Sequence, residues 1–232
     1  MKVYNVCMKI RILYGVPGAR KAKGTVIIVD VFRAATLEAY LLQRNAVHII
    51  PVSTVEEAFN LKRANKDYIL VGEEQGISIE GFDNGNSPKE IVHADFTDKV
   101  IVHRSSQGTQ GLINAKGADE IIFGSFTVTA SIVKYIRARK PQDVSIVAMD
   151  GKESEDDVFA KFLKERLLGK KPDADKVIQG LRRHKASLLF LDPLYPHLPK
   201  EDLELCLKVD IFDFIPILEM GDTHPIVKKL RI

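Results

Sequence analysis

The sequence predicts a single α/β domain, residues 1–232, in which helices cover both faces of a mainly parallel or mixed sheet in three α/β/α layers. Apolar runs typical of buried strands alternate with segments of helical spacing. In addition, 232 residues with 45% hydrophobic content can bury a core without a disulfide or a metal. The apolar runs are TVIIVDV (25–31), AVHIIPV (46–52), YILVG (68–72), KVIVH (99–103), DEIIFGS (119–125) and VSIVAM (144–149).

Helical spacing of apolar residues predicts the elements between and after these strands. In GKESEDDVFAKFLKERLL, acidic residues open a helix and Lys and Arg stand near its end, as the helix dipole favours. We therefore interpret residues 151–232 as mostly helical packing and capping, closed by a strand and tail over 210–232. The other predicted helices are 35–45, 54–65, 109–117, 127–140 and 198–209.

Two strand–helix–strand segments form a candidate internal repeat, 25–54 and 99–127, which would make the fold from two similar βαβ units. Their offset stays close to ~73 residues. The alternative is that any two such units look alike. If the repeat is real, the turns 30–36 and 104–109 should face one ligand.

Composition excludes several classes of protein. The net charge of +3 is far below the concentrated positive face of a dedicated nucleic-acid binder. Cys7 and Cys206 are too few for a disulfide framework and lack metal-site spacing, which suits a reducing compartment. The N-terminus has no signal-like apolar region, and no run of 18 apolar residues occurs. We expect a cytoplasmic protein that engages neither nucleic acid nor membrane, with a homodimer as a candidate assembly.

Four polar turns follow apolar strands, and in open α/β sheets ligands bind beyond the carboxyl ends of the strands. We call these the strand-end turns. The first, DVFRAAT, offers a carboxylate at Asp30, an anion clamp at Arg33 and a helix entry at Thr36. Its alternative is an Asp that caps the helix and pairs with Arg33.

The second strand-end turn, GEEQG, places Glu73 and Glu74 at the end of a strand. Adjacent side chains point to different sides of a strand, so one of them would reach a site. Carboxylates suit Mg²⁺, which takes one or two of them and keeps several waters. A solvated acidic turn is the alternative.

The third strand-end turn is GFDNGNSPKEI (81–91). Its glycines permit unusual backbone geometry, and Asp83 and Asn86 can form local hydrogen bonds. Ser87 followed by Pro88 predicts a capped helix start, whose N–H groups could bind an anion. The alternative is a well-capped helix after a turn.

The fourth strand-end turn, HRSSQGT (103–109), resembles an anion cradle. His103 is more often a core or surface histidine than a catalyst. The acidic cluster 150–157 could supply another ligand, although a capped helix start explains most of it. The cradle residues are Ser105, Ser106, Gly108 and Thr109.

Familiar phosphate chemistries are excluded by inspection. The chain has no GxxxxGK[ST] loop and no C-x5-R motif, and Phe32 stands where a D-x-D phosphatase needs its second Asp.

Together, DVFRAAT, GEEQG with GFDNGNSPKEI, SSQGTQGL and SEDD resemble the 2-phosphosulfolactate phosphatase family, from about residue 25 to 169. The resemblance implies an α/β, Mg²⁺-dependent hydrolase that converts 2-phospho-3-sulfolactate to 3-sulfolactate and phosphate, a step toward coenzyme M in methanogens. It implicates Asp30, Arg33, Thr36, Glu73, Asp83, Asn86, Ser87, Ser105, Ser106, Gly108 and Thr109.

Three departures from the family pattern stand out. Glu74 occupies a position where many relatives have Arg, and Gln107 one where Asn is common. Met149-Asp150-Gly151 replaces a C-A-G sequence, so no thiol acts there.

The mechanism that we expect places Mg²⁺ on Asp30 and Glu73, with Asp83 as a further ligand. Arg33 and the hydroxyl-rich turns would bind the small anionic phosphorylated substrate. Water activated by the metal would attack phosphorus, and direct attack by Asp30 is the rival. The alternative functions are hydrolysis of another small phosphorylated hydroxy acid and non-catalytic anion binding on the same scaffold.

Overall fold

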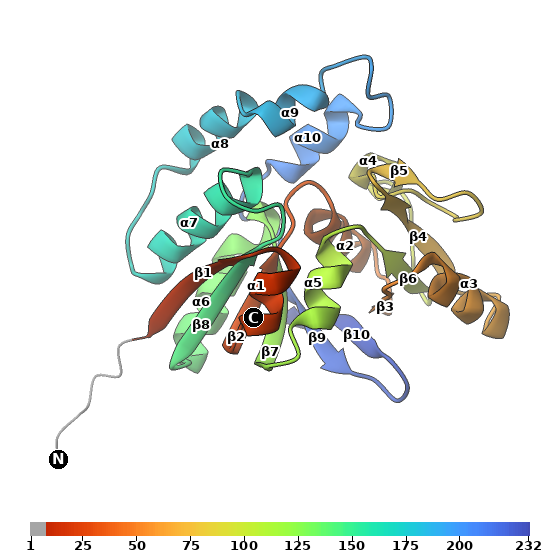
Figure 1. Cartoon of the computed structure of the whole chain (residues 1–232), viewed down its shortest axis with the longest axis horizontal. Coiled ribbons are helices and arrows are strands. Elements are labelled where there is room, and N and C mark those ends of the chain that lie inside the picture. The colour runs from red at the N-terminus through yellow and green to blue at the C-terminus, as the bar shows by residue number, and fades with distance from the viewer. Residues whose placement is uncertain (1–7) are drawn as a thin grey trace.

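The computed structural model describes residues 8–232 and contains a ten-stranded mixed sheet with helices on both faces (Figure 1). The strand order is β1-β8-β2-β7-β9-β10-β3-β6-β4-β5. This confirms the predicted α/β class. Cys7 lies outside the described residues, and Cys206 is a buried free thiol.

The sheet consists of two parallel blocks joined by a hairpin. β2 pairs in parallel with β7 and β8, and β1 with β8, whereas β6 pairs in parallel with β3 and β4. The first block comprises β1 (Lys9–Tyr14), β8 (Asp143–Ala148), β2 (Gly24–Val29) and β7 (Ala118–Gly124). The second block comprises β3 (His48–Pro51), β6 (Val100–Arg104), β4 (Ile69–Glu74) and the antiparallel β5 (Ile77–Ser78).

Residues 210–232, predicted to form one strand and a tail, instead form the hairpin β9 (Phe214–Met220) and β10 (Pro225–Arg231). That prediction is wrong because the expected tail is a second strand, and both strands lie in the middle of the sheet. β9 pairs antiparallel with β7, and β10 with β3. The hairpin therefore links the two parallel blocks.

Alternating side chains of β2 show how the layers form. Ile27 and Val29 pack in one core cluster, with residues of α6 and α7, while Val26 and Ile28 pack in another, with residues of α1, α2 and α5. This is the alternation of a strand that is buried on both faces. The helices concerned are α1 (Gly15–Lys21), α2 (Ala34–Gln43), α5 (Gly108–Asn114), the 3-10 turn η1 (Phe126–Val128), α6 (Thr129–Arg139) and α7 (Glu155–Leu167).

A third, smaller cluster lies under α3 (Val55–Ala64), where Ala58 packs with Val102 and Leu70. The helix α4 (Pro88–Ile91) starts at the predicted Ser-Pro sequence but is a single turn.

Three helices form what we call the helical cap, which lies above the strands in Figure 1. They are α8 (Ala174–Arg182), α9 (Lys185–Leu189) and α10 (Lys200–Cys206). Asp173 caps α8 by accepting the N–H of Lys176 at 3.0 Å. The cap closes the end of the molecule at which the parallel strands finish.

The two segments of the candidate repeat lie in exchanged positions. β2 of the first segment pairs with β7 of the second, and β3 of the first pairs with β6 of the second. Each segment therefore runs from one parallel block to the other, in opposite order along the chain. This arrangement is what a pair of related units would give, and the repeat itself stays a prediction.

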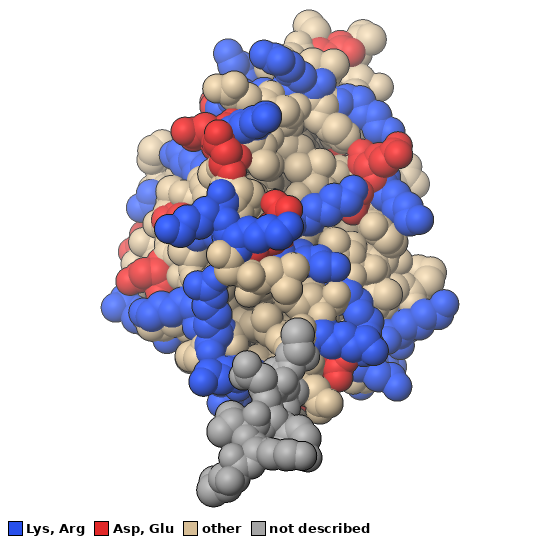
Figure 2. Space-filling model, turned by 90° about the vertical axis from the view of Figure 1, so that its left-hand side faces the viewer, with Lys and Arg blue, Asp and Glu red and all other residues tan. Residues whose placement is uncertain are grey.

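On the side of the molecule shown in Figure 2, Lys and Arg side chains are prominent, with Asp and Glu between them. No helix within residues 8–232 is both long and apolar enough to span a membrane.

Candidate active site

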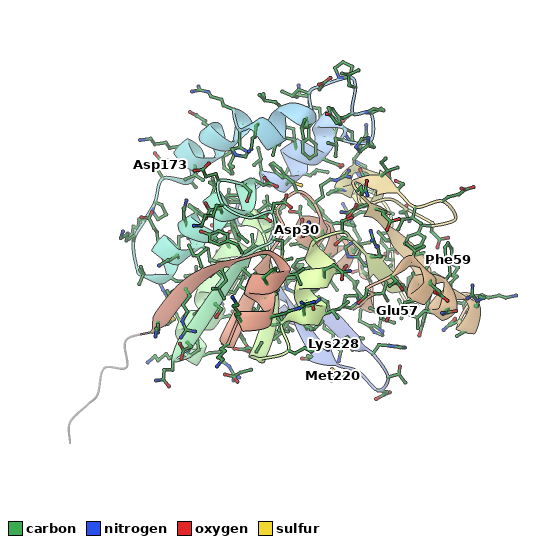
Figure 3. The ribbon with its side chains drawn as sticks, in the orientation of Figure 1. Asp30, Glu57, Phe59, Asp173, Met220 and Lys228 are labelled. Carbon is green, nitrogen blue, oxygen red and sulfur yellow. The ribbon has the colours of Figure 1, made fainter. Side chains whose placement is uncertain are left out.

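A cavity of about 210 Å³ opens where strands of both parallel blocks end. Asp30 follows β2 and Asp150 follows β8, while Glu73 is the next-to-last residue of β4 and Ser106 lies just after β6. Figure 3 shows Asp30 at the top of the strands, below the helical cap. The lining residues are Asp30, Phe32, Arg33, Glu73, Gln75, Gly76, Asn86, Ser106, Gln107, Asp150 and Leu198.

Asp30 is 7% exposed and closes the buried strand β2. Its Oδ1 accepts the N–H of Ala34, the first residue of α2, at 3.0 Å. Burial, followed by the charge of Asp150, raises the pKa of Asp30 to about 7. Asp30 thus does both things that the sequence suggested: it binds the helix start and presents a carboxyl group to the cavity.

Arg33 is 4% exposed, and its guanidinium is held by three groups. Nη1 donates to Asp202 Oδ2 at 2.9 Å and to the carbonyl of His197 at 3.0 Å, and Nη2 donates to the carbonyl of Gly76 at 3.1 Å. The alternative in which Arg33 pairs with Asp30 does not hold, because the ion-pair partner of Arg33 is Asp202 of α10. The guanidinium is fixed before any ligand binds.

Glu73 joins the ends of β4 and β6. Its carboxylate accepts the N–H of Gly76 at 2.6 Å, the N–H of Ser106 at 2.5 Å and the Ser106 hydroxyl at 3.0 Å. Glu74 points away, where it pairs with Arg104 at 2.8 Å and is 58% exposed at its side chain. The departure at Glu74 therefore puts no carboxylate in the cavity.

In the third strand-end turn, one predicted residue lines the cavity and others hold the turn in place. Asn86 lines the cavity. Ser87 stands at the N-cap of α4 but makes no capping hydrogen bond; its hydroxyl donates to Asp202 Oδ1 at 2.8 Å. Asp202 takes over the capping role, since it also accepts the N–H of Lys89 at 2.8 Å.

Asp83, a predicted metal ligand, lies outside the cavity lining. Its Oδ2 accepts the N–H of Leu70 at 2.8 Å and pairs with Lys62 Nζ at 3.2 Å. Asp83 therefore holds the turn against β4 and is not among the residues that line the cavity.

Three predicted substrate-binding hydroxyls also lie behind the cavity wall. Thr109 N–H donates to the Ser105 hydroxyl and Ser105 N–H to the Thr109 hydroxyl, both at 3.0 Å. The Thr36 hydroxyl donates to the carbonyl of Val31 at 3.0 Å. These side chains shape the turns from inside and are buried.

Gly108 allows the first and fourth strand-end turns to meet. A Cβ at Gly108 would lie 2.7 Å from Asp30 Oδ2 and 2.8 Å from Ala34 Cβ. The two turns thus converge on one point, as the repeat hypothesis requires.

The acidic cluster 150–157, which the sequence explained mainly as a helix cap, contributes a carboxyl group to the cavity. Asp150 lines the cavity, and burial raises its pKa. Burial, with Asp150 next in importance, raises the pKa of Glu155 to about 8. Asp156 accepts the N–H of Val31 at 2.7 Å and so ties the cluster to the first turn. The available signal was the position of Asp150 directly after a buried strand.

The interpretation of residues 151–232 as packing and capping alone was wrong in one respect. Asp202 and the carbonyl of His197 hold Arg33, and Leu198 lines the cavity. Gln75 and Gln107, which line it too, had no assigned role in the sequence-based prediction.

The charges in the cavity are unbalanced. The carboxylates of Asp30, Glu73 and Asp150 face one guanidinium, Arg33, which already pairs with Asp202. Within residues 8–232, no cluster of three or more His, Cys, Asp or Glu side chains is arranged to hold a metal ion. Mg²⁺ needs one or two carboxylates, and Asp30 and Asp150 fit that requirement, since both line the cavity and the charge of Asp150 raises the pKa of Asp30.

Comparison with known proteins identifies the family. The sequence model of the family described as 2-phosphosulpholactate phosphatase matches residues 12–221. A Thermoplasma volcanium protein named probable 2-phosphosulfolactate phosphatase is 34% identical over 82% of this chain and 87% of its own length. A Bacillus subtilis protein of the same name is 28% identical over 89% of this chain and 92% of its own. The chain therefore belongs to the 2-phosphosulpholactate phosphatase family.

Proposed function

We propose that this chain is a Mg²⁺-dependent phosphatase that hydrolyses 2-phospho-3-sulfolactate to 3-sulfolactate and phosphate, a step toward coenzyme M. The observation that carries the proposal is the convergence of Asp30, Asp150, Glu73 and Arg33 at the strand ends of a chain of this family. A cavity so rich in carboxylates would repel a phosphate dianion unless a cation were also present.

Asp30 and Asp150 are the residues that would hold Mg²⁺, because Glu73 already accepts three hydrogen bonds. When bound, the ion supplies positive charge to the phosphoryl oxygens. Arg33, fixed by Asp202, adds the positive charge of a guanidinium to the same cavity. The amides of Gln75, Gln107 and Asn86 are available to the carboxylate and sulfonate of the substrate.

Asp30 has two candidate roles in the attack on phosphorus. As a carboxylate in the cavity, it can orient an attacking water and accept its proton. Alternatively it attacks directly and forms an aspartyl-phosphate. The stereochemical course at a substrate made chiral at phosphorus separates the routes: net inversion supports a single attack by water, and net retention supports two displacements through an aspartyl-phosphate.

Phosphate release from a panel of phosphorylated 2-hydroxy acids, with and without Mg²⁺, tests the proposal. We expect release from 2-phospho-3-sulfolactate, dependent on Mg²⁺ and abolished by EDTA. The Asp30→Asn variant should fold and lose at least ~10³-fold in kcat. Faster hydrolysis of another acid would identify that acid as the substrate. Phosphate binding without any turnover would instead support a non-catalytic anion-binding protein.

A cytoplasmic location and a homodimeric assembly stay predictions from the sequence. Cell fractionation and analytical ultracentrifugation would test them.

A further inference from the structure

A chain of three buried polar side chains runs from helix α2 to the cavity. Glu38 Oε1 lies 2.7 Å from His103 Nδ1, and His103 Nε2 lies 3.2 Å from Asn86 Oδ1. Glu38 and His103 are 0% exposed, and Asn86 is 5% exposed. Only Asn86, at the end of the chain of contacts, belongs to the cavity lining.

The hydrogen bonds fix where the protons lie. Asn86 Oδ1 is an acceptor, so His103 Nε2 must carry a hydrogen. His103 Nδ1 then either accepts a hydrogen bond from the O–H of a neutral Glu38 or donates one to an ionised Glu38 as part of an imidazolium. Both states leave the Glu38–His103 pair with no net charge.

The remaining state, a neutral imidazole with hydrogen on Nδ1 beside an ionised Glu38, would leave a net negative charge fully buried. It is disfavoured because Glu38 Oε2 has no hydrogen-bond partner. Burial also raises the pKa of Glu38. In that state His103 Nε2 would carry no hydrogen and would accept a hydrogen bond from Asn86 Nδ2, so the oxygen of the amide would face the opposite way. Burial thus favours the orientation in which Asn86 accepts from His103.

We propose that Glu38 and His103 are positioning residues that hold the Asn86 amide with its Nδ2 directed to the cavity, as a hydrogen-bond donor to an anionic oxygen of the substrate. The inference rests on the proposed function for its ligand class. It also has a physical motive: an amide oxygen turned to the cavity would add to the negative potential of Asp30, Glu73 and Asp150.

A double-mutant cycle tests the proposal. Asn86→Ala and His103→Leu should each lower kcat/KM for 2-phospho-3-sulfolactate by about tenfold or more, mainly through KM. Together they should cost little more than Asn86→Ala alone, because His103 acts through Asn86. Effects that multiply in the double variant would overturn the proposal.

Two substitutions of Glu38 test the proton arrangement. In Glu38→Gln, the new amide donates to His103 Nδ1 and keeps hydrogen on Nε2, so kcat/KM should stay within about threefold of the wild type. Glu38→Met fills similar volume without a donor and should resemble His103→Leu. Equal activity of the Gln and Met variants would contradict the proposal.

Val102→Ala is the matched control, since Val102 precedes His103 on β6 and packs in the separate cluster under α3. It should lower thermal stability while kcat/KM is retained.

Calorimetric binding of inorganic phosphate with Mg²⁺ repeats the cycle without turnover. If the wild type binds phosphate but hydrolyses none of the acids, the proposed function fails while the binding cycle still decides the role of His103. A wild type that does not bind phosphate would overturn both.

Discussion

The strand-end turns and the helical cap contribute to the cavity in different ways. The turns supply the groups that would meet a substrate: Asp30, Glu73, Asn86 and Ser106. The cap supplies groups that hold those turns, above all Asp202, which binds Arg33, Ser87 and the N–H of Lys89. The candidate chemical groups therefore lie in segments next to strands, whereas a helix more than a hundred residues away along the chain holds the first and third turns in place.

Asp202→Asn is the strongest test of this division. The change removes the charge that compensates Arg33, and breaking a buried pair in this way costs about 3 kcal/mol of unfolding free energy. We expect KM to rise more than kcat falls, because Arg33 loses its fixed position. Urea denaturation and steady-state kinetics measure the two effects.

Glu201→Gln is the matched control, because Glu201 is the neighbour of Asp202 and forms an exposed pair with Lys89. It should change stability by less than about 0.5 kcal/mol. Equal effects of the two substitutions would refute the supporting role of the cap.

The raised pKa of Asp30 gives a pH-dependent test of the first turn. From 3.8, the pKa rises to about 7 on folding, so the folded protein binds more protons than the unfolded chain between these values. The stability of the metal-free protein therefore falls as pH rises through that window, by ~1–3 kcal/mol for this group. Asp30→Asn should be more stable than the wild type at pH 8 and similar at pH 4, measured in EDTA. A variant less stable than the wild type at pH 8 would contradict the assignment.

Gly108→Ala tests the convergence of the first and fourth turns. The new methyl group would meet Asp30 Oδ2 and Phe123 Cζ, both at 2.7 Å, so we expect a loss of ~1–3 kcal/mol and lower activity. Gly180 in α8, which has no atoms within 4 Å of an added Cβ, provides the control. Gly180→Ala should stabilise the protein by ~0.5–1 kcal/mol. Thermal denaturation compares the two, and a tolerated Gly108→Ala would show that the turns can separate.

Glu74→Ala should have the smallest effect. Because Glu74 pairs with Arg104 outside the cavity, we expect kcat/KM for 2-phospho-3-sulfolactate to change by less than about threefold and stability by less than about 1 kcal/mol. A large change in substrate preference would instead place Glu74 near the bound substrate.

The core strands were predictable from sequence because burial on both faces leaves continuous apolar runs such as 25–31, which contains β2. β1 escaped prediction because an edge strand tolerates charged residues, as KIRILY does. The hairpin was missed in part because Pro216 and Pro225 stand within its strands, and proline usually argues against a central strand.

The cavity was predictable to the extent that polar residues follow apolar strands. Asp30, Arg33, Glu73, Asn86 and Ser106 were all placed there by that rule. The rule could not separate residues that line the cavity from residues that hold the turns in place. The same turns contain both kinds of polar residue, and the side chains of the second kind form hydrogen bonds inside the protein: Thr36, Ser87, Ser105 and Thr109. The partnership of Arg33 with Asp202 joins residues with no sequence relation, so packing alone reveals it.

The hairpin β9–β10 has a consequence for the order of folding. It follows every other described element along the chain, yet it occupies the middle of the sheet between β7 and β3. During synthesis the two parallel blocks would emerge first, with β7 and β3 still lacking their central neighbours. The edges of β7 and β3 would then stay unpaired until β9 and β10 are made, and such long-range pairing is slow. The cavity draws on both blocks, so its final shape depends on a hairpin that is synthesised after both of them.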